Sequence, residues 1–258
     1  MQSPWRLEPR RATLRLGTLE GAIDLSQPAL GLAELRLSGG ALVAMQLLGV
    51  ELPSSDAQGD RLVEAYLRGD DLVATYAEPG FTSPAGGSSA FRWQVYWRAC
   101  AARFPRALAA IETIVSVQTG LLDSWPQLTL RSTIPAAEVA VWRIDAGRND
   151  CNCERIAPGV ATTTISAAEG WGCFGFRLAG SSACYLETIH PADFDSSAVA
   201  SAPANRFALR HTLFRERLEK GVILRSRALG LVLPDWPTSA AIAEIHAALA
   251  DEALPLTA

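Results

Sequence analysis

The sequence predicts an all-β protein, a large antiparallel β-sandwich that ends in a short C-terminal helix. Three observations support this fold class: apolar and polar residues alternate over many short segments, helical spacing is scarce before residue 237, and no internal repeat is visible. Alternation with period two places successive side chains on opposite faces of a strand. The lack of a repeat argues against a propeller. We expect one domain over residues 1–258.

Residues 92–98 show the clearest alternation. Trp93, Val95 and Trp97 occupy every second position and would pack into the core. The opposite face of this strand would carry Arg92, Gln94, Tyr96 and Arg98. Residues 111–119 show much the same pattern, which places Glu112 on the polar face of a second strand.

The same pattern predicts the remaining strands. We expect them at residues 12–16, 31–37, 41–47, 62–67, 71–76, 127–132, 138–144, 162–167, 173–178, 183–190, 207–217 and 222–233. The dipeptide Gly69-Asp70 separates two of these segments and predicts a hairpin turn between them.

The C-terminal region carries the one helical signal. Pro237, Thr238 and Ser239 offer a start, because threonine and serine cap helix N-termini. Apolar residues then recur at helical spacing, namely Ile242, Ile245 and Leu249. This amphipathic pattern predicts a terminal helix that packs on the sandwich.

Composition and charge exclude several functions. Of the 258 residues, 49% are hydrophobic and 19% are charged, which is enough for a substantial core and argues against disorder. A net charge of −4 without a long basic run makes nucleic acid or an anionic membrane an unexpected partner. No segment has the length of a signal-peptide core or a membrane span, and the five cysteines have no disulfide spacing. We expect a cytoplasmic protein without a cofactor or metal, although Cys151 and Cys153 could begin a metal site.

Polar strand faces are the main sign of a ligand. Such faces carry the polar residues of 92–98, then Glu112, and finally Arg225. Aromatic rings beside Arg, Gln and Glu suit a sugar, because its hydroxyls need planar partners and its C–H face packs on a ring. The alternative is an exposed sheet face with cross-strand ion pairs, and both interpretations stay open. The candidate substrate-binding residues are Arg92, Gln94, Tyr96, Arg98, Glu112, His190 and Arg225.

Glu187 is the candidate catalytic residue. It shares one strand face with Tyr185 and Ile189, whose apolar surroundings would favour the neutral carboxyl group. The alternative is an ion pair with Arg225 or Arg227 on a neighbouring strand. His190 lies three residues later, so on an extended strand it points to the opposite face. The sequence therefore favours a structural role for His190, with a substrate contact as the alternative.

Three segments resemble galactose mutarotases (aldose epimerases). The segment Cys184-Tyr185-Leu186-Glu187-Thr188-Ile189-His190-Pro191 is similar to a late strand of that family. Residues 218–224 resemble the turn and the last long strand that follow it. Residues 31–49 are similar to the opening hairpins of the family. The resemblance implies a β-supersandwich that binds sugar on a concave sheet. It also implies that Glu187 takes a proton from the anomeric hydroxyl while a mid-chain histidine protonates the ring oxygen. Residues 100–180 contain no histidine, so the acid–base pair is incomplete in the sequence.

The sequence thus predicts a carbohydrate-binding protein and leaves its chemistry open. An aldose epimerase-type enzyme and a catalytically silent sugar-binding or regulatory module are the two main hypotheses. A third is a glycosidase or lyase that uses Glu187 with Glu112, which requires both carboxyl groups across one cleft. The expected partner is a small carbohydrate, and the sequence does not indicate an oligomeric state.

Overall fold

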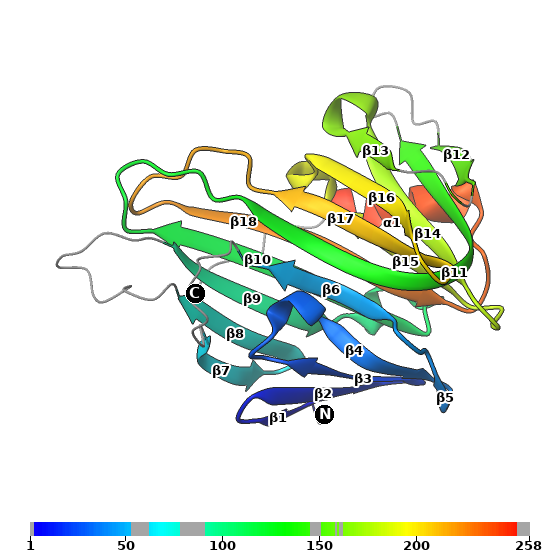
Figure 1. Ribbon diagram of the computed structural model, residues 1–258, viewed down its shortest axis with the longest axis horizontal. Coiled ribbons are helices and arrows are strands. Elements are labelled where there is room, and N and C mark those ends of the chain that lie inside the picture. The colour runs from blue at the N-terminus through cyan, green and yellow to red at the C-terminus, as the bar shows by residue number, and fades with distance from the viewer. Residues whose placement is uncertain are drawn as a thin grey trace.

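The structure is an all-β sandwich with a C-terminal helix (Figure 1). The computed structural model describes residues 3–52, 62–77, 91–144, 151–157, 159 and 162–251. The strands are β1 (Trp5–Glu8), β2 (Arg11–Leu16), β3 (Leu19–Asp24), β4 (Leu32–Leu37), β5 (Gly40–Ala41), β6 (Gln46–Glu51), β7 (Leu62–Arg68), β8 (Asp71–Ala77), β9 (Phe91–Ala99), β10 (Ala109–Thr119), β11 (Leu128–Ile144), β12 (Cys151–Ile156), β13 (Thr163–Ser166), β14 (Trp171–Leu178), β15 (Cys184–Ile189), β16 (Ser196–Ala202), β17 (Arg206–Leu213) and β18 (Ile223–Leu233). The helices are α1 (Ser239–Ala250) and the short 3₁₀ segments η1 (Pro28–Leu30), η2 (Ala101–Arg103), η3 (Ala167–Glu169) and η4 (Pro191–Asp193).

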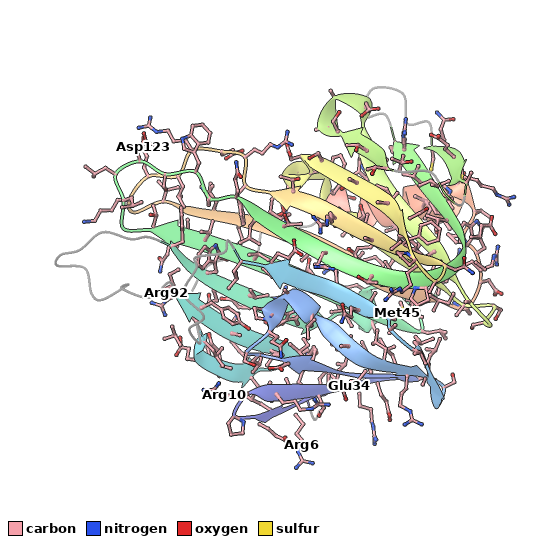
Figure 2. The ribbon with its side chains drawn as sticks, viewed as in Figure 1. Arg6, Arg10, Glu34, Met45, Arg92 and Asp123 are labelled. Atoms are coloured by element: carbon pink, nitrogen blue, oxygen red, sulfur yellow. The ribbon has the colours of Figure 1, made fainter. Side chains whose placement is uncertain are left out.

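The strands form three antiparallel layers that share strands. The large sheet has the order β7-β8-β9-β10-β18-β15-β14-β11-β12. The small sheet has the order β6-β11-β17-β16-β13. The N-terminal sheet contains β1 to β5 and meets β6 through the pair Leu32–Leu47. On its exposed side, Arg11 and Glu34 form an ion pair of 2.5 Å; Glu34 is labelled in Figure 2.

Strand β11 belongs to two sheets. Its first half, up to Pro135, pairs with β17 in the small sheet, and its second half pairs with β14 and β12 in the large sheet. A register shift between Ala136 and Glu138 marks the point where the strand passes from one layer to the other. Extra residues of this kind bend a strand and increase its twist. The curved ribbon of β11 therefore joins the two layers (Figure 1).

Apolar residues fill both sides of the large sheet. The inner face of the large sheet points toward the small and N-terminal sheets, and its core includes Trp93, Val95 and Trp97, as the alternation predicts. The outer face points away from them and carries a second apolar cluster under α1, which includes Trp142, Ile242 and Leu249. Helix α1 thus covers part of the outer face and leaves the β7 to β10 side to polar residues.

Most predicted elements agree with the structure. Strands β7 and β8 meet at Gly69-Asp70, where Gly69 has a φ of +60°, a backbone conformation that glycine adopts without strain. Helix α1 begins after Thr238, whose side chain accepts a hydrogen bond from the Ala241 N–H.

The bounds of four predicted strands differ from the structure, and sequence patterning missed four strands. The strand expected at residues 41–47 is a turn around Ala44, which has a φ of +57°, followed by β6. The strands expected at 127–132 and 138–144 are one continuous strand, β11. The strand expected at 207–217 ends at Leu213, before Phe214 with a φ of +62°. The missed strands are β1, β3, β12 and β16.

Candidate functional site

The outer face of the large sheet brings together most of the predicted ligand residues. In the strand register, Glu112 lies opposite Arg98, and Ser116 lies between Gln94 and Arg225. Tyr96 lies on β9 midway between Gln94 and Arg98, two residues from each, and Arg92 lies at the start of β9 (Figure 2). Because directly paired residues point to the same side of a sheet, these side chains share one surface. We call this surface the polar face: Arg92, Gln94, Tyr96, Arg98, Glu112, Ser116 and Arg225.

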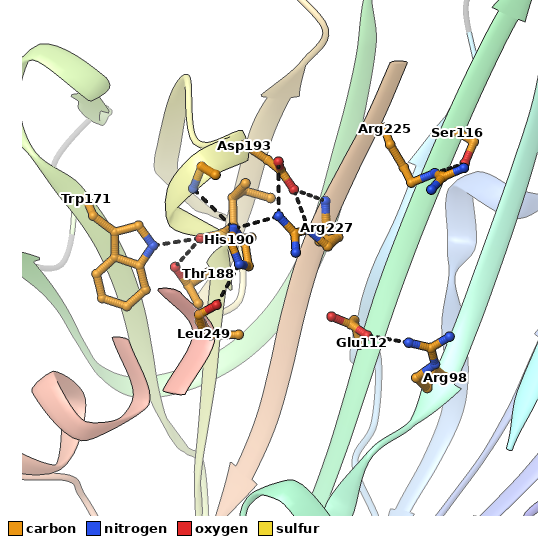
Figure 3. A network of polar contacts seen from close by, with 12 residues as sticks. Arg98, Glu112, Ser116, Trp171, Thr188, His190, Asp193, Arg225, Arg227 and Leu249 are labelled. Carbon is orange, nitrogen blue, oxygen red and sulfur yellow. Dashed lines mark hydrogen bonds and ion pairs between the residues drawn. The ribbon is translucent and has the colours of Figure 1, made fainter. Parts of the chain in front are cut away.

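Ion pairs hold one end of the polar face. Arg98 binds Asp71 through two bonds, with Nε–Oδ1 2.8 Å and Nη2–Oδ2 3.2 Å, and its Nη1 lies 3.3 Å from Glu112 Oε2. Arg103 of η2 adds a second contact to Glu112 at 3.5 Å. The hydrogen bonds to Asp71 raise the pKa of Arg98. This end of the polar face therefore contains cross-strand ion pairs, as expected for an exposed sheet face without a ligand (Figure 3).

A hydrogen-bonded chain that ends at Glu64 follows on the same face. The Tyr96 hydroxyl donates to Gln94 Oε1 at 2.5 Å, Gln94 Nε2 donates to Thr75 Oγ1 at 3.4 Å, and Thr75 donates to Glu64 at 3.3 Å. The Arg68 guanidinium lies 5.6 Å from the centre of the Tyr96 ring. Burial raises the pKa of Tyr96, so its hydroxyl stays protonated at neutral pH. Half-buried hydroxyl, amide and ring groups are the partners that a sugar requires.

Arg225 extends this arrangement onto β18. Its Nε donates a hydrogen bond of 3.1 Å to Ser116 Oγ on β10 (Figure 3). The side chains of Arg225, Gln94 and Tyr96 are all partly exposed, so their donors and acceptors remain accessible from the outer side of the sheet.

His190 links helix α1 to the large sheet through hydrogen bonds. Its Nδ1 accepts from the Ala192 N–H at 3.1 Å and from Arg227 Nη2 at 2.9 Å, and its Nε2 lies 2.6 Å from the Leu249 carbonyl oxygen (Figure 3). Because Nδ1 accepts two bonds, Nε2 carries the proton and donates to Leu249. Arg227 is in turn paired with Asp193 at 2.8 Å. Both ring nitrogens of His190 are thus engaged in contacts within the protein.

Glu187 lies on the inner face of the large sheet. Its carboxyl oxygens accept from the Tyr185 hydroxyl, from Ser132 Oγ at 2.5 Å and from His211 Nε2 at 3.1 Å. The side chains of Glu187 and His211 have no exposed surface. On the far side of the imidazole ring, Ser197 Oγ lies 2.6 Å from Nδ1. We call these five residues the buried network.

The buried network corrects both sequence interpretations of Glu187. Glu187 shares its face with Tyr185 and Ile189 as predicted, but its partners are hydroxyls and a histidine instead of purely apolar groups. The arginine pair expected as the alternative is absent from the contacts of the described residues, since Arg227 binds Asp193 on the outer side. Burial, and then the proximity of Glu187, raises the pKa of Tyr185 well above its usual value. Tyr185 therefore remains a hydrogen-bond donor to Glu187.

Sequence reasoning missed His211 as a partner of Glu187. The family resemblance placed the acid histidine in the middle of the chain, whereas the histidine in contact with Glu187 comes from β17. The available signal was the alternation of Phe207, Leu209, His211 and Leu213, which puts the histidine on the apolar face of its strand. A polar ring on such a face needs a buried partner.

The two glutamates of the glycosidase hypothesis point in opposite directions. Glu112 lies opposite Leu229 and Glu187 lies opposite Gly230, so consecutive residues of β18 place them on different faces. The sheet lies between their carboxyl groups, and no common cleft joins them. This arrangement removes the geometric basis of that hypothesis.

Within the part of the chain that the structure describes, no three His, Cys, Asp or Glu residues gather closely enough to hold a metal ion. In the same residues, no helix has the length and apolar character needed to cross a membrane.

Comparisons with known proteins identify solved structures with a similar fold. Neither the protein-family models nor the curated protein sequences contain a match. Among solved structures, a candidate aldose 1-epimerase from Escherichia coli K12 aligns with a TM-score of 0.55 at 12% identity, over 87% of this chain and 98% of that one. A galactose mutarotase-like protein from Clostridium acetobutylicum aligns with a TM-score of 0.53 at 8% identity, over 89% and 98%. Likeness at such low identity establishes the fold alone. The protein therefore has the galactose mutarotase-like fold.

Proposed function

We propose that the protein binds a small carbohydrate on the polar face of the large sheet. The observation that carries this proposal is a row of polar residues on three adjacent strands, in which Tyr96, Gln94 and Arg225 are partly exposed and Ser116 is buried between them. The row offers an aromatic ring, an amide, a hydroxyl and a planar guanidinium within one surface. These groups match the alternating hydroxyls and C–H faces of a pyranose ring. Fold-level analogy with the mutarotase-like structures supports the same ligand class.

The groups of the polar face favour binding without anomer exchange. Exchange requires a base and an acid that both reach the sugar. On this side of the sheet, Asp71 and Glu112 are paired with Arg98, Asp193 is paired with Arg227, and Glu64 is paired with Arg92. Both nitrogens of His190 are engaged by the protein. We therefore propose a catalytically silent sugar-binding module, with Arg92, Gln94, Tyr96, Arg98 and Arg225 as the residues around the ligand.

One observation favours a second candidate, an aldose epimerase-type enzyme. Glu187 and His211 are in contact at 3.1 Å, and a glutamate base with a histidine acid is the pair that the family resemblance implies. In this alternative, Glu187 would take the proton of the anomeric hydroxyl, and His211 would protonate the ring oxygen. Because both side chains are fully buried, the two sheets would have to separate to admit a sugar.

A binding experiment tests the primary proposal. Ligand-detected NMR and calorimetric titration with a panel of aldoses should reveal binding, and Tyr96→Phe and Arg225→Gln should each weaken it by about tenfold, the effect of losing one strong hydrogen bond. Arg155→Gln is a matched control, because Arg155 is 76% exposed on β12 and pairs with Glu138 away from the polar face. Lack of binding to every sugar, or equal binding by the Tyr96 and Arg225 variants, would overturn the proposal.

Anomer exchange separates the two candidates. Exchange spectroscopy on the same sugars should show no acceleration by the native protein. Acceleration that disappears in both Glu187→Gln and His211→Asn would establish the epimerase alternative. Circular dichroism of both variants would show whether the loss reflects unfolding.

A further inference from the structure

A concavity lies on the outer surface of the small sheet, away from the polar face. It has a volume of about 300 Å³ and is lined by Arg131 and Thr133 of β11, Gln46 of β6 and Arg206 of β17, with three alanines completing the wall. Strands β6, β11 and β17 run side by side here (Figure 1). Ser132 and His211 of the same strands point to the other side of this sheet, into the buried network. The concavity is therefore separate from both sites described above.

Positive charge accumulates around this concavity. Arg131 lies directly opposite Arg210 in the strand register. Two like charges in this arrangement repel each other and destabilise the pair of strands. Glu51 compensates part of this charge through a contact of 2.6 Å with Arg131. None of the residues that line the concavity is acidic. The local charge is therefore positive, since Arg131, Arg206 and the adjacent Arg210 outnumber Glu51. The whole chain, in contrast, has a net charge of −4.

Arg206 is oriented by its own hairpin. Its Nε donates to the Pro203 carbonyl oxygen at 3.0 Å, across the turn between β16 and β17. Among the described residues, its two terminal nitrogens have no partner. A guanidinium held at Nε presents these nitrogens as a planar pair of donors, the geometry that binds a carboxylate or phosphate.

The spacing of the two lining arginines indicates the size of the ligand. Arg206 pairs with Pro135, four residues along β11 from Arg131, a distance of about 13 Å at the usual rise of a strand. Both side chains reach the same concavity, with Thr133 and Gln46 between them. A volume of this size accepts a small molecule larger than a single ion.

We propose that this concavity is a second binding site, for a small molecule that carries at least two negative charges as phosphate or carboxylate groups. Arg131 and Arg206 bind the charged groups, and Gln46 and Thr133 bind neutral polar atoms between them. The proposal is independent of sugar binding on the polar face.

Calorimetric titration at constant ionic strength tests this site. The probes are inorganic phosphate, glycerol 3-phosphate and succinate, and sodium chloride sets the background. At least one probe should bind in the millimolar range or more tightly. Arg206→Gln and Arg131→Gln should each weaken that binding by about tenfold or more, the effect expected for loss of a charge-assisted bond. Comparison of the two phosphate probes with succinate shows whether the site prefers phosphate or carboxylate groups.

Two control variants locate the bound anion. Arg155→Gln removes one exposed charge elsewhere and should leave the affinity unchanged. Arg225→Gln tests the polar face, which also contains arginines. Lack of binding by all three probes, undiminished binding by Arg206→Gln, or loss of binding in Arg225→Gln alone would each overturn the proposal.

Discussion

The two faces of the large sheet carry glutamates with opposite surroundings. Glu112 on the outer face and Glu187 on the inner face flank the same strand, β18, and both are almost fully buried. Glu112 contacts two arginines whose side chains are 26% and 30% exposed. Among the described residues, the hydrogen-bond partners of Glu187 are all buried themselves. Burial alone therefore does not identify a carboxyl group that a ligand can reach; the face of the sheet and the exposure of the partners decide it.

The two faces of the large sheet also have different structural roles. The buried network joins Glu187 and Tyr185 of the large sheet to Ser132, Ser197 and His211 of the small sheet. It therefore connects the two layers of the sandwich with directional bonds. The polar face makes its contacts within one layer and leaves groups accessible to a ligand. Variants on the inner face should change stability, and variants on the outer face should change binding.

Removal of the Glu187 carboxyl group should have the largest effect. Glu187→Ala leaves the donors of Tyr185, Ser132 and His211 without their acceptor, and the loss of one partner of a buried polar pair costs about 3–5 kcal/mol. Urea denaturation measures this change in the free energy of unfolding. Glu64→Ala on β7, beside the polar face, is the control, because the Glu64 side chain is 51% exposed and its pair with Arg92 should contribute at most about 1 kcal/mol. Equal losses in the two variants would contradict the distinction between the faces.

A methyl group added at Gly230 should disturb the same network by crowding. A Cβ at this position would lie 2.6 Å from the Tyr185 hydroxyl oxygen and 3.1 Å from Leu48 Cδ1. Because Tyr185 is held by its bond to Glu187, Gly230→Ala should destabilise the protein by about 1–3 kcal/mol, the usual cost of overpacking.

Gly120→Ala provides the matched control for this prediction. An added Cβ at Gly120 meets no atom within 4 Å, so the change should be neutral or slightly stabilising through reduced freedom of the unfolded chain. Thermal unfolding of both variants distinguishes crowding from a general effect of glycine replacement. A neutral Gly230→Ala would show that Tyr185 can move without cost.

Tyr185 on the inner face and Tyr96 on the outer face should ionise at different pH values in alkaline solution. The effect on stability should be smaller than that of the Glu187 and Gly230 variants. Burial raises the pKa of both, but that of Tyr185 is raised further than that of Tyr96. The stability that Tyr185 contributes is therefore fully present below pH 10 and is lost as the pH rises toward its folded-state pKa. The loss should be about 1.4 kcal/mol per pH unit above 10.

Comparison of native protein with Tyr185→Phe isolates this effect. The variant should show a shallower decline in the free energy of unfolding above pH 10, because the buried thiols, such as Cys184 with a pKa raised to about 12, act equally in both proteins. Absorbance titration should show that Tyr96→Phe removes a phenol that ionises before Tyr185. Identical slopes for native protein and Tyr185→Phe would contradict the raised pKa.

Local patterning predicted much of the fold for a simple reason. In strands such as β9 and β10, side-chain alternation reflects burial of one face, and this signal is present in the sequence. It also placed six of the seven predicted ligand residues on one surface, because their strands proved to be neighbours. The failures occur where backbone geometry overrides alternation, as at Ala44 and at the passage of β11 between sheets. Positive φ values and register shifts depend on contacts with distant strands.

The pattern of residues is sufficient to predict the all-β class, the polar character of one face of β9, and the opposite orientation of Glu187 and His190. These properties follow from the two-residue repeat of a strand, which requires no knowledge of its neighbours. Only the tertiary structure decided that His211 meets Glu187, that His190 binds helix α1, and that two sheets seal the glutamate from solvent. Those contacts join residues 24 and 59 positions apart in the chain, and strand order and layer packing alone bring them together.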